Sequence, residues 1–121
     1  MIKLYFIEDT VEYHKALKYE IEPQLKTKGI EPVFIFRKDN STLAQDLFMG
    51  VTIVLIDYDL GKMFGDEIIA EIDGYPEYRT LPIIFYSGGE PLQTLIQKTR
   101  RYGNVRCSTK HELGKKIIEI L

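Results

Sequence analysis

Short apolar runs alternate with amphipathic segments along the whole chain. Each run has four to six residues and is followed by polar or glycine-containing residues, and all but the weak fifth run are rich in Ile, Val, Leu, Phe and Tyr. Runs of this length and composition are typical of strands buried on both faces of a sheet. The pattern therefore predicts five strands, at residues 2–7, 33–36, 51–56, 81–86 and 104–108.

The segments between these runs have the apolar spacing of helices. The first predicted helix covers residues 10–25, with Asp9 and Glu12 as a capping pair, and Pro23 is expected to kink or end it. The second begins at Ser41, the third covers 66–72, and Pro91 lies in the first turn of the fourth. Thr109 and Glu112 form a predicted capping box for the last helix.

Five strand–helix units with short connections predict an α/β fold. Right-handed crossovers place helices on both faces of a parallel sheet. We therefore expect a (βα)5 flavodoxin-like doubly wound parallel sheet with strand order 2-1-3-4-5. The 121 residues are expected to form one domain, 1–121, without repeats or linkers.

Composition narrows the functional classes. The formal net charge is −2, and the small basic cluster of Lys98, Arg100 and Arg101 is interpreted as a solvated helix end, so nucleic acid is not an expected partner. No apolar run approaches the roughly 20 residues of a membrane helix. A single cysteine, Cys107, excludes an internal disulfide and agrees with a reducing compartment. The expected location is the cytoplasm.

Acidic residues follow two of the predicted strands. Glu8 and Asp9 come directly after residues 2–7, and Asp57 comes directly after residues 51–56. With order 2-1-3-4-5 these strands are neighbours, so the three carboxylates converge at the edge where such folds bind ligands. Two carboxylates 4 Å apart repel by about 4 kcal/mol at an effective dielectric of 20, which a cation would relieve. Oxygen ligands in a half-open site suit Mg²⁺.

Further residues near that edge could hold a phosphate group. Ser87 follows the fourth predicted strand and supplies a hydroxyl, and Gly88 and Gly89 would let an anion approach the backbone closely. Lys110, after the fifth strand, is the nearest candidate for a phosphate-binding cation. The sequence thus predicts carboxylates, a hydroxyl and an ammonium around one pocket.

These residues together resemble the receiver domain of response regulators, the phosphoacceptor module of two-component signalling. The resemblance extends over the whole chain. It depends on the acidic pair Glu8-Asp9, on Asp57 followed by Gly61, and on Ser87 thirty residues after Asp57. It implies a phosphorelay component rather than an enzyme, with a sensor histidine kinase or phosphotransfer protein and a downstream protein target as partners.

The resemblance also implies roles for individual residues. Asp57 would be the nucleophile that accepts the phosphoryl group. Mg²⁺ would be bound by Asp9 and Asp57 directly, by Glu8 through water and by the backbone carbonyl of Asp59. Ser87 and Lys110 would contact the phosphoryl oxygens.

The chain departs from the family pattern at three places. The usual lysine–proline pair after the fifth strand is missing, and either Ser108 or Lys110 takes the place of the lysine. The aromatic switch residue of the fifth strand is also absent, since residues 105–107 are Val, Arg and Cys. Gly61 stands where proline is commoner, which predicts a looser loop.

Two other functions fit parts of the sequence. Asp57-Tyr-Asp59 is an Asp-x-Asp motif after an apolar strand, as in phosphatases similar to the haloacid-dehalogenase superfamily. Alternatively, a receiver-like scaffold could work by docking alone, without phosphorylation. The missing lysine–proline pair favours docking, whereas the intact acidic triad favours phosphorylation. The cognate kinase, the target and the oligomeric state do not follow from the sequence.

Overall fold

Five parallel strands form the centre of the computed structural model, which describes residues 1–121. The sheet order is β2-β1-β3-β4-β5, as predicted, and all four neighbouring pairs are parallel. The fold class, a doubly wound flavodoxin-like sheet, is therefore confirmed. The strands are β1 (Ile2–Ile7), β2 (Pro32–Arg37), β3 (Ile53–Asp57), β4 (Ile83–Ser87) and β5 (Val105–Thr109).

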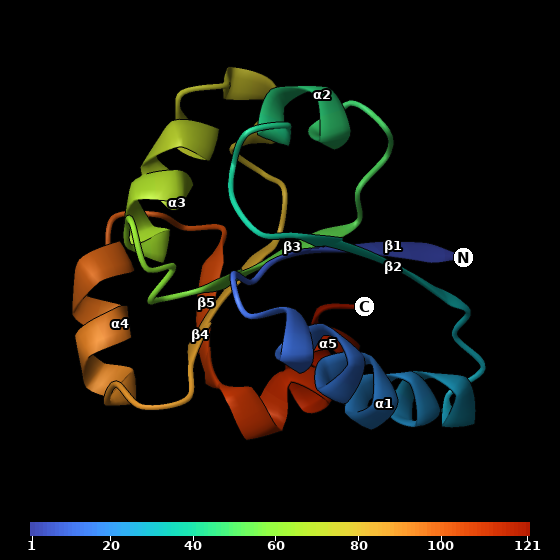
Figure 1. Cartoon of the computed structure of the whole chain (residues 1–121). Helices are drawn as coiled ribbons and strands as arrows, with labels where there is room; N and C mark the ends of the chain where they lie inside the picture. The colour runs from blue at the N-terminus through green and yellow to red at the C-terminus, as the bar shows by residue number, and fades with distance from the viewer.

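Helices cover both faces of the sheet, as Figure 1 shows. One face carries α1 (Val11–Thr27) and α5 (Leu113–Ile120), and the other carries α2 (Leu43–Leu47), α3 (Gly65–Asp73) and α4 (Leu92–Thr99). Two short 3₁₀ turns, η1 (Pro76–Tyr78) and η2 (Lys110–Glu112), complete the elements. None of the helices combines the length and the apolar composition of a membrane-spanning segment.

Two apolar clusters hold these layers together. Every residue of β3 and β4 is buried, which explains their nearly continuous apolar sequences. Alternate residues of each strand enter opposite clusters: Val54 and Ile56 face α2, α3 and α4, whereas Ile53 and Leu55 face α1 and α5. The site-bearing strands are thus fixed from both sides.

Pro23 was expected to kink or end the first helix, and the expectation that the helix ends there was wrong. α1 continues to Thr27, and Pro23 lies inside it. Proline removes one hydrogen bond to a carbonyl four residues earlier, here that of Tyr19, whose side chain is 84% exposed. Leu25, beyond the proline, is fully buried with the rest of the helix's apolar stripe. Packing on the sheet thus outweighs the local cost.

The predicted helix starts also need correction. Asp9 and Glu12 do not form a cap, because Thr10 precedes α1 and no side chain caps its first turn. Thr109 belongs to β5, and its hydroxyl reaches the Glu112 carboxylate at 3.2 Å rather than a backbone N–H. Pro91 precedes α4 instead of lying in its first turn.

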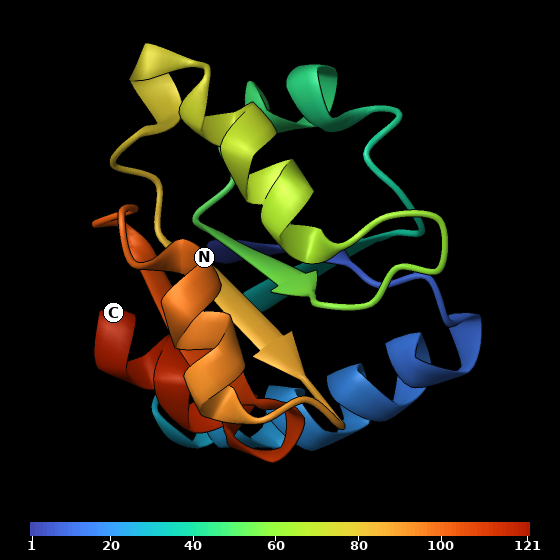
Figure 2. The same ribbon diagram turned by 90° about the vertical axis from the view of Figure 1, so that its left-hand side faces the viewer.

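The carboxyl ends of the strands meet at one edge of the sheet. In Figure 2 the arrows of β3 and β4 point the same way, toward the loops that precede α3 and α4. Gly65 begins α3 directly against this edge. A Cβ on Gly65 would collide with the backbone oxygen of Asp57 and lie 2.8 Å from side-chain carbons of Ile56 and Phe85. Only glycine allows α3 to start this close to the end of β3.

Candidate functional site

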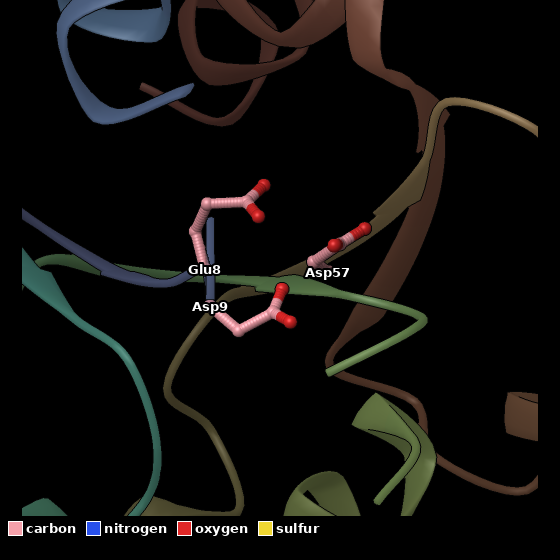
Figure 3. A group of neighbouring side chains, drawn as sticks. All are labelled: Glu8, Asp9 and Asp57. Carbon is pink, nitrogen blue, oxygen red and sulfur yellow. The ribbon is translucent and has the colours of Figure 1, made fainter. Parts of the chain in front are cut away.

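Glu8, Asp9 and Asp57 come together at the carboxyl ends of β1 and β3. Ile7 of β1 pairs with Ile56 of β3, so the next residues of the two strands are neighbours. One oxygen from each of the three carboxylates lies within 4.8 Å of the others, and Figure 3 shows Glu8 and Asp9 extending toward Asp57. Glu8 and Asp57 are buried, whereas Asp9 is more open to solvent. The expected convergence is therefore present.

This crowding changes the acidity of Asp57. Burial, the largest cause, and the nearby Glu8 carboxylate raise the pKa of Asp57 from 3.8 to about 7. The Asp9 carboxylate adds to this increase in pKa, and the Lys110 ammonium opposes it. A bound cation would favour the ionised form of Asp57. The electrostatics of the pocket thus agree with a cation site.

The donor set fits Mg²⁺. The site offers carboxylate oxygens from two adjacent strands and is open on the side of Asp9. An octahedral ion with ligands at 2.0–2.1 Å needs oxygens roughly 3 to 4 Å apart and commonly keeps several waters. Oxygens within 4.8 Å of one another satisfy this need with small side-chain movements. Glu8, Asp9 and Asp57 are the side chains that could hold the ion.

Asp59 lies in the loop after β3. Its carboxylate accepts a hydrogen bond from the Gly61 N–H at 2.9 Å, and its backbone pairs with Phe64 in an isolated bridge. The side chain is thus occupied within its own loop, which does not favour the general-acid role of the phosphatase motif. Gly61 has φ +77°, which proline cannot adopt. Glycine at this position therefore suits the backbone conformation of this turn.

Lys110, and not Ser108, directs its side chain to the acidic pocket. Its Nζ lies 3.4 Å from Glu8 Oε1 and 3.8 Å from the centre of the Tyr13 ring. Ser108 is buried in β5 and donates its hydroxyl to the Thr109 carbonyl. Lys110 is the first residue of η2, the short turn between β5 and α5. It approaches the pocket from this turn.

Ser87 ends β4 at the rim of the same pocket. Its Oγ accepts hydrogen bonds from the backbone N–H groups of Gly89 and Glu90, at 3.2 and 3.0 Å. Its own hydroxyl proton therefore remains available to another acceptor. The Lys110 side chain would lie 3.9 Å from a Cβ on Gly88, so the absence of a side chain there keeps the space beside the ammonium open.

An open pocket of about 790 Å³ lies at this edge and brings together some of the predicted residues, but Glu8 and Asp9 do not line it. Asp57, Asp59, Ser87 and Lys110 line it, and so do aromatic residues that sequence reasoning did not assign to the site. Tyr58 and Phe64 stack at 4.9 Å between ring centres. The added lining residues are Tyr13, Tyr58, Phe64, Glu90 and His111.

Tyr86 is a further residue that sequence reasoning missed. It was interpreted only as the last apolar residue of a strand, yet its hydroxyl donates to Glu8 Oε1 at 3.0 Å inside the core. A buried phenol requires a hydrogen-bond partner, so its place in a fully buried strand was a usable signal. The contact of Tyr13 with Lys110, in contrast, joins distant segments and leaves no sequence pattern.

Solved structures share this fold over the whole chain. The signal receiver domain of a DNA-binding response regulator from Colwellia psychrerythraea superposes with a TM-score of 0.79 at 18% identity, covering 99% of this chain and 98% of its own. The Mn²⁺-bound response regulator Rcp1 superposes with a TM-score of 0.65 at 22% sequence identity, covering 99% of this chain and 88% of its own. The phosphorylated cyanobacterial phytochrome response regulator RcpA has a TM-score of 0.67 at 20% sequence identity. It covers 98% of this chain and 87% of its own.

The chain thus has the fold of response-regulator receiver domains. No protein-family model matches the sequence, and no curated protein matches it. The sequence resemblance and the structural similarity therefore agree on the fold, while the roles of the site residues depend on the chemistry of the pocket itself.

Proposed function

We propose that this chain is a receiver domain of two-component signalling that accepts a phosphoryl group on Asp57. The observation that carries the proposal is the set of three carboxylates, Glu8, Asp9 and Asp57, with oxygens within 4.8 Å at the ends of adjacent strands. Asp57 is the last residue of β3 and lines an open pocket, so a phosphodonor can reach it.

The proposed reaction is a phosphoryl transfer with the carboxylate as nucleophile. An oxygen of Asp57 attacks phosphorus in a phosphohistidine or a small acyl phosphate, in line with the leaving group. The new O–P bond forms as the P–N or P–O bond to the donor breaks. The leaving imidazole or carboxylate keeps the electron pair, and the product is an aspartyl phosphate.

Ser87 and Lys110 are proposed to stabilise the transferred group. The Ser87 hydroxyl has a free proton to donate to a phosphoryl oxygen. The Lys110 ammonium already lies in the pocket beside Glu8 and would neutralise a second oxygen. In this proposal, phosphorylation changes the partners of both groups and, through them, the loop before α4 and the η2 turn.

Mg²⁺ is the proposed cofactor, and when bound it supplies charge neutralisation for the carboxylates and the phosphoryl oxygens. Asp9 and Asp57 would hold it directly, Glu8 through water and Asp59 through its backbone carbonyl. The structural relatives Rcp1 and RcpA, which were solved with Mn²⁺ bound and phosphorylated respectively, support a divalent cation and phosphorylation.

The proposed partners follow from this chemistry. A sensor histidine kinase or a phosphotransfer protein would supply the phosphoryl group, and a downstream protein would respond to it. The domain would promote only its own phosphorylation and dephosphorylation rather than turn over a substrate. A phosphorelay of this kind is expected to act in the cytoplasm.

Incubation with acetyl phosphate and Mg²⁺ tests the proposal directly. Intact mass spectrometry should show one added phosphoryl group in the unsubstituted protein and none in Asp57→Asn. Omission of Mg²⁺ should also abolish the added mass. The same labelling of Asp57→Asn would show that another residue accepts the group and would overturn the assignment.

A second candidate function is a docking module that is not phosphorylated. Two observations favour it: Lys110 is already engaged by Glu8 and the Tyr13 ring, and β5 carries Val105, Arg106 and Cys107 with no aromatic residue. Absence of labelling with both acetyl phosphate and a phosphorylated histidine donor, in a protein that still binds Mg²⁺, would favour this candidate.

A further inference from the structure

We infer that Tyr86 is a positioning residue for the divalent-cation site and acts by holding the Glu8 carboxylate in place. This inference rests on the proposed function, because it concerns the same Mg²⁺ site. It adds a residue from the core of β4 whose hydroxyl bonds to Glu8 and to neither of the proposed direct ligands, Asp9 and Asp57. The contact behind it is the 3.0 Å hydrogen bond from the Tyr86 hydroxyl to Glu8 Oε1.

Both partners of this hydrogen bond are completely buried. Tyr86 and Glu8 each have 0% exposure, so water cannot replace either of them. A buried phenol without a partner and a buried carboxylate without donors are both costly. The hydrogen bond thus satisfies two groups at once and ties the ring in β4 to the end of β1.

The remaining contacts of Glu8 leave its carboxylate little freedom. The backbone N–H of Thr10 donates to Oε2 at 3.3 Å, while Lys110 Nζ lies 3.4 Å from Oε1, the oxygen that also accepts from Tyr86. Donors therefore contact both oxygens from three segments of the chain. Groups that orient a metal-site carboxylate in this way usually contribute to metal affinity, since the site then needs less rearrangement.

The small side chain of Ser108 is consistent with this placement of Tyr86. Tyr86 and Ser108 are paired in register on β4 and β5, and paired residues of a parallel sheet project to the same face. Ser108 is buried and its hydroxyl bonds only to the Thr109 carbonyl, so its small side chain leaves space beside the Tyr86 ring. Lys110 Nζ then lies 5.8 Å from the centre of that ring. The small residue at position 108, where the family pattern can have lysine, and the tyrosine at position 86 thus fit together in the packing around Lys110.

Tyr86→Phe tests the inference, and Tyr5→Phe is a matched control. Tyr5 is also completely buried, and its hydroxyl donates to the Asp46 carboxylate at 2.8 Å, within the cluster on the other face of the sheet. Both substitutions remove one buried phenol–carboxylate hydrogen bond and should lower Tm. Only Tyr86→Phe removes it from the cation site.

Calorimetric titration of the metal-free proteins with Mg²⁺ alone provides the readout. We expect the Kd of Tyr86→Phe to rise about tenfold, at the lower end of effects seen for groups that orient metal ligands. Tyr5→Phe should bind Mg²⁺ like the unsubstituted protein. Unchanged Mg²⁺ affinity in a folded Tyr86→Phe, or an equal loss in both variants, would overturn the inference.

A measurement on the unsubstituted protein keeps the test decisive if Tyr86→Phe fails to fold. With tyrosines labelled by ¹³C at Cζ, the Tyr86 resonance should move on Mg²⁺ saturation, whereas the Tyr5 resonance should stay in place. A Tyr86 resonance that does not respond while Mg²⁺ binds would overturn this inference and leave the proposed function intact. If the unsubstituted protein binds no Mg²⁺, the proposed function itself fails.

Discussion

Lys110 and Glu8, from opposite ends of the chain, form an ion pair with 3.4 Å between Nζ and Oε1. The Glu8 side chain is completely buried and that of Lys110 is 19% exposed, so solvent screens the pair only weakly. The pair gives the acidic pocket an internal cation. Lys110 is therefore placed to serve both the stability of the domain and the proposed phosphoryl transfer.

Lys110→Ala should destabilise the metal-free domain by about 2 kcal/mol. Breaking a buried ion pair leaves an uncompensated charge, and the partial exposure of Lys110 reduces the usual cost. Urea unfolding in the presence of EDTA measures this change. The control is Lys116→Ala, which removes a surface pair with Glu119 and should cost at most about 0.5 kcal/mol.

The same Lys110→Ala variant should be phosphorylated more slowly by acetyl phosphate, because the pocket loses its cation for a phosphoryl oxygen. Ser108→Ala should be phosphorylated at the rate of the unsubstituted protein, since the Ser108 hydroxyl bonds only to the Thr109 carbonyl. Equal rates for Lys110→Ala and the unsubstituted protein would remove Lys110 from the site.

Asp57→Asn should stabilise the metal-free protein at neutral and alkaline pH by about 1–2 kcal/mol. The pKa of Asp57 is raised from 3.8 to about 7, so ionisation of Asp57 costs stability as the pH rises through this range. The gain should thus be complete above about pH 7 and absent near pH 4. Urea unfolding of both proteins in EDTA across this range checks the prediction. A gain that is independent of pH would contradict the crowding of carboxylates.

Gly65→Ala should damage both the fold and the cation site. The added methyl group would collide with the Asp57 backbone oxygen and approach Ile56 and Phe85 to 2.8 Å, and these buried atoms cannot move away easily. We expect a loss of about 2 kcal/mol or more and weaker Mg²⁺ binding. Gly89→Ala, where no atom lies within 4 Å of the new Cβ, is the control and should be nearly neutral in both measurements.

A second buried carboxylate, Asp46, should contribute to stability against acid. The Arg37 guanidinium, at 2.8 Å, is the main cause that lowers the pKa of Asp46 from 3.8 to about 2. A folded-state pKa below that of the unfolded chain gives stability above about pH 4 that is lost as the pH falls through about 2. Arg37 is 42% exposed, so we expect about 1 kcal/mol rather than the full value of the shift.

Comparison of the unsubstituted protein with Asp46→Asn checks this contribution. The difference in the free energy of unfolding should be constant above about pH 4 and should shrink by about 1 kcal/mol toward pH 2. Other carboxylates titrate equally in both proteins, so the difference isolates Asp46. A difference that stays constant down to pH 2 would show that the pair with Arg37 gives no stability linked to ionisation.

The local sequence pattern was sufficient to predict the five strands and to place the acidic residues at the carboxyl ends of two of them. Ile2–Ile7 is a strand with the bounds that its apolar run predicts, and β3 ends at Asp57, one residue beyond its predicted apolar run. The alternation of strands and helices also restricted the possible strand order of the sheet, since right-handed crossovers allow few arrangements. The convergence of Glu8, Asp9 and Asp57 followed from that order alone.

Helix boundaries depended on contacts that a local pattern does not contain. Pro23 is a local stop signal, but Leu25 and its apolar neighbours gain more by packing on the sheet than the single missing hydrogen bond costs. Likewise, Thr109 has the sequence of a capping residue, yet pairing with Ser87 places it in β5. In both cases the tertiary contacts contribute more stabilisation than the local signals do.

The sequence by itself thus determined which residue types stand at the ends of the strands, because strand periodicity and chain order are properties of neighbouring residues. Only the tertiary structure decided which lysine reaches the pocket and which groups hold Glu8. Lys110 and Tyr86 reach Glu8 from distant segments of the chain, and Tyr13 contacts Lys110. These contacts depend on side-chain directions and on the space left by Ser108. They form only when the helices and the sheet pack together.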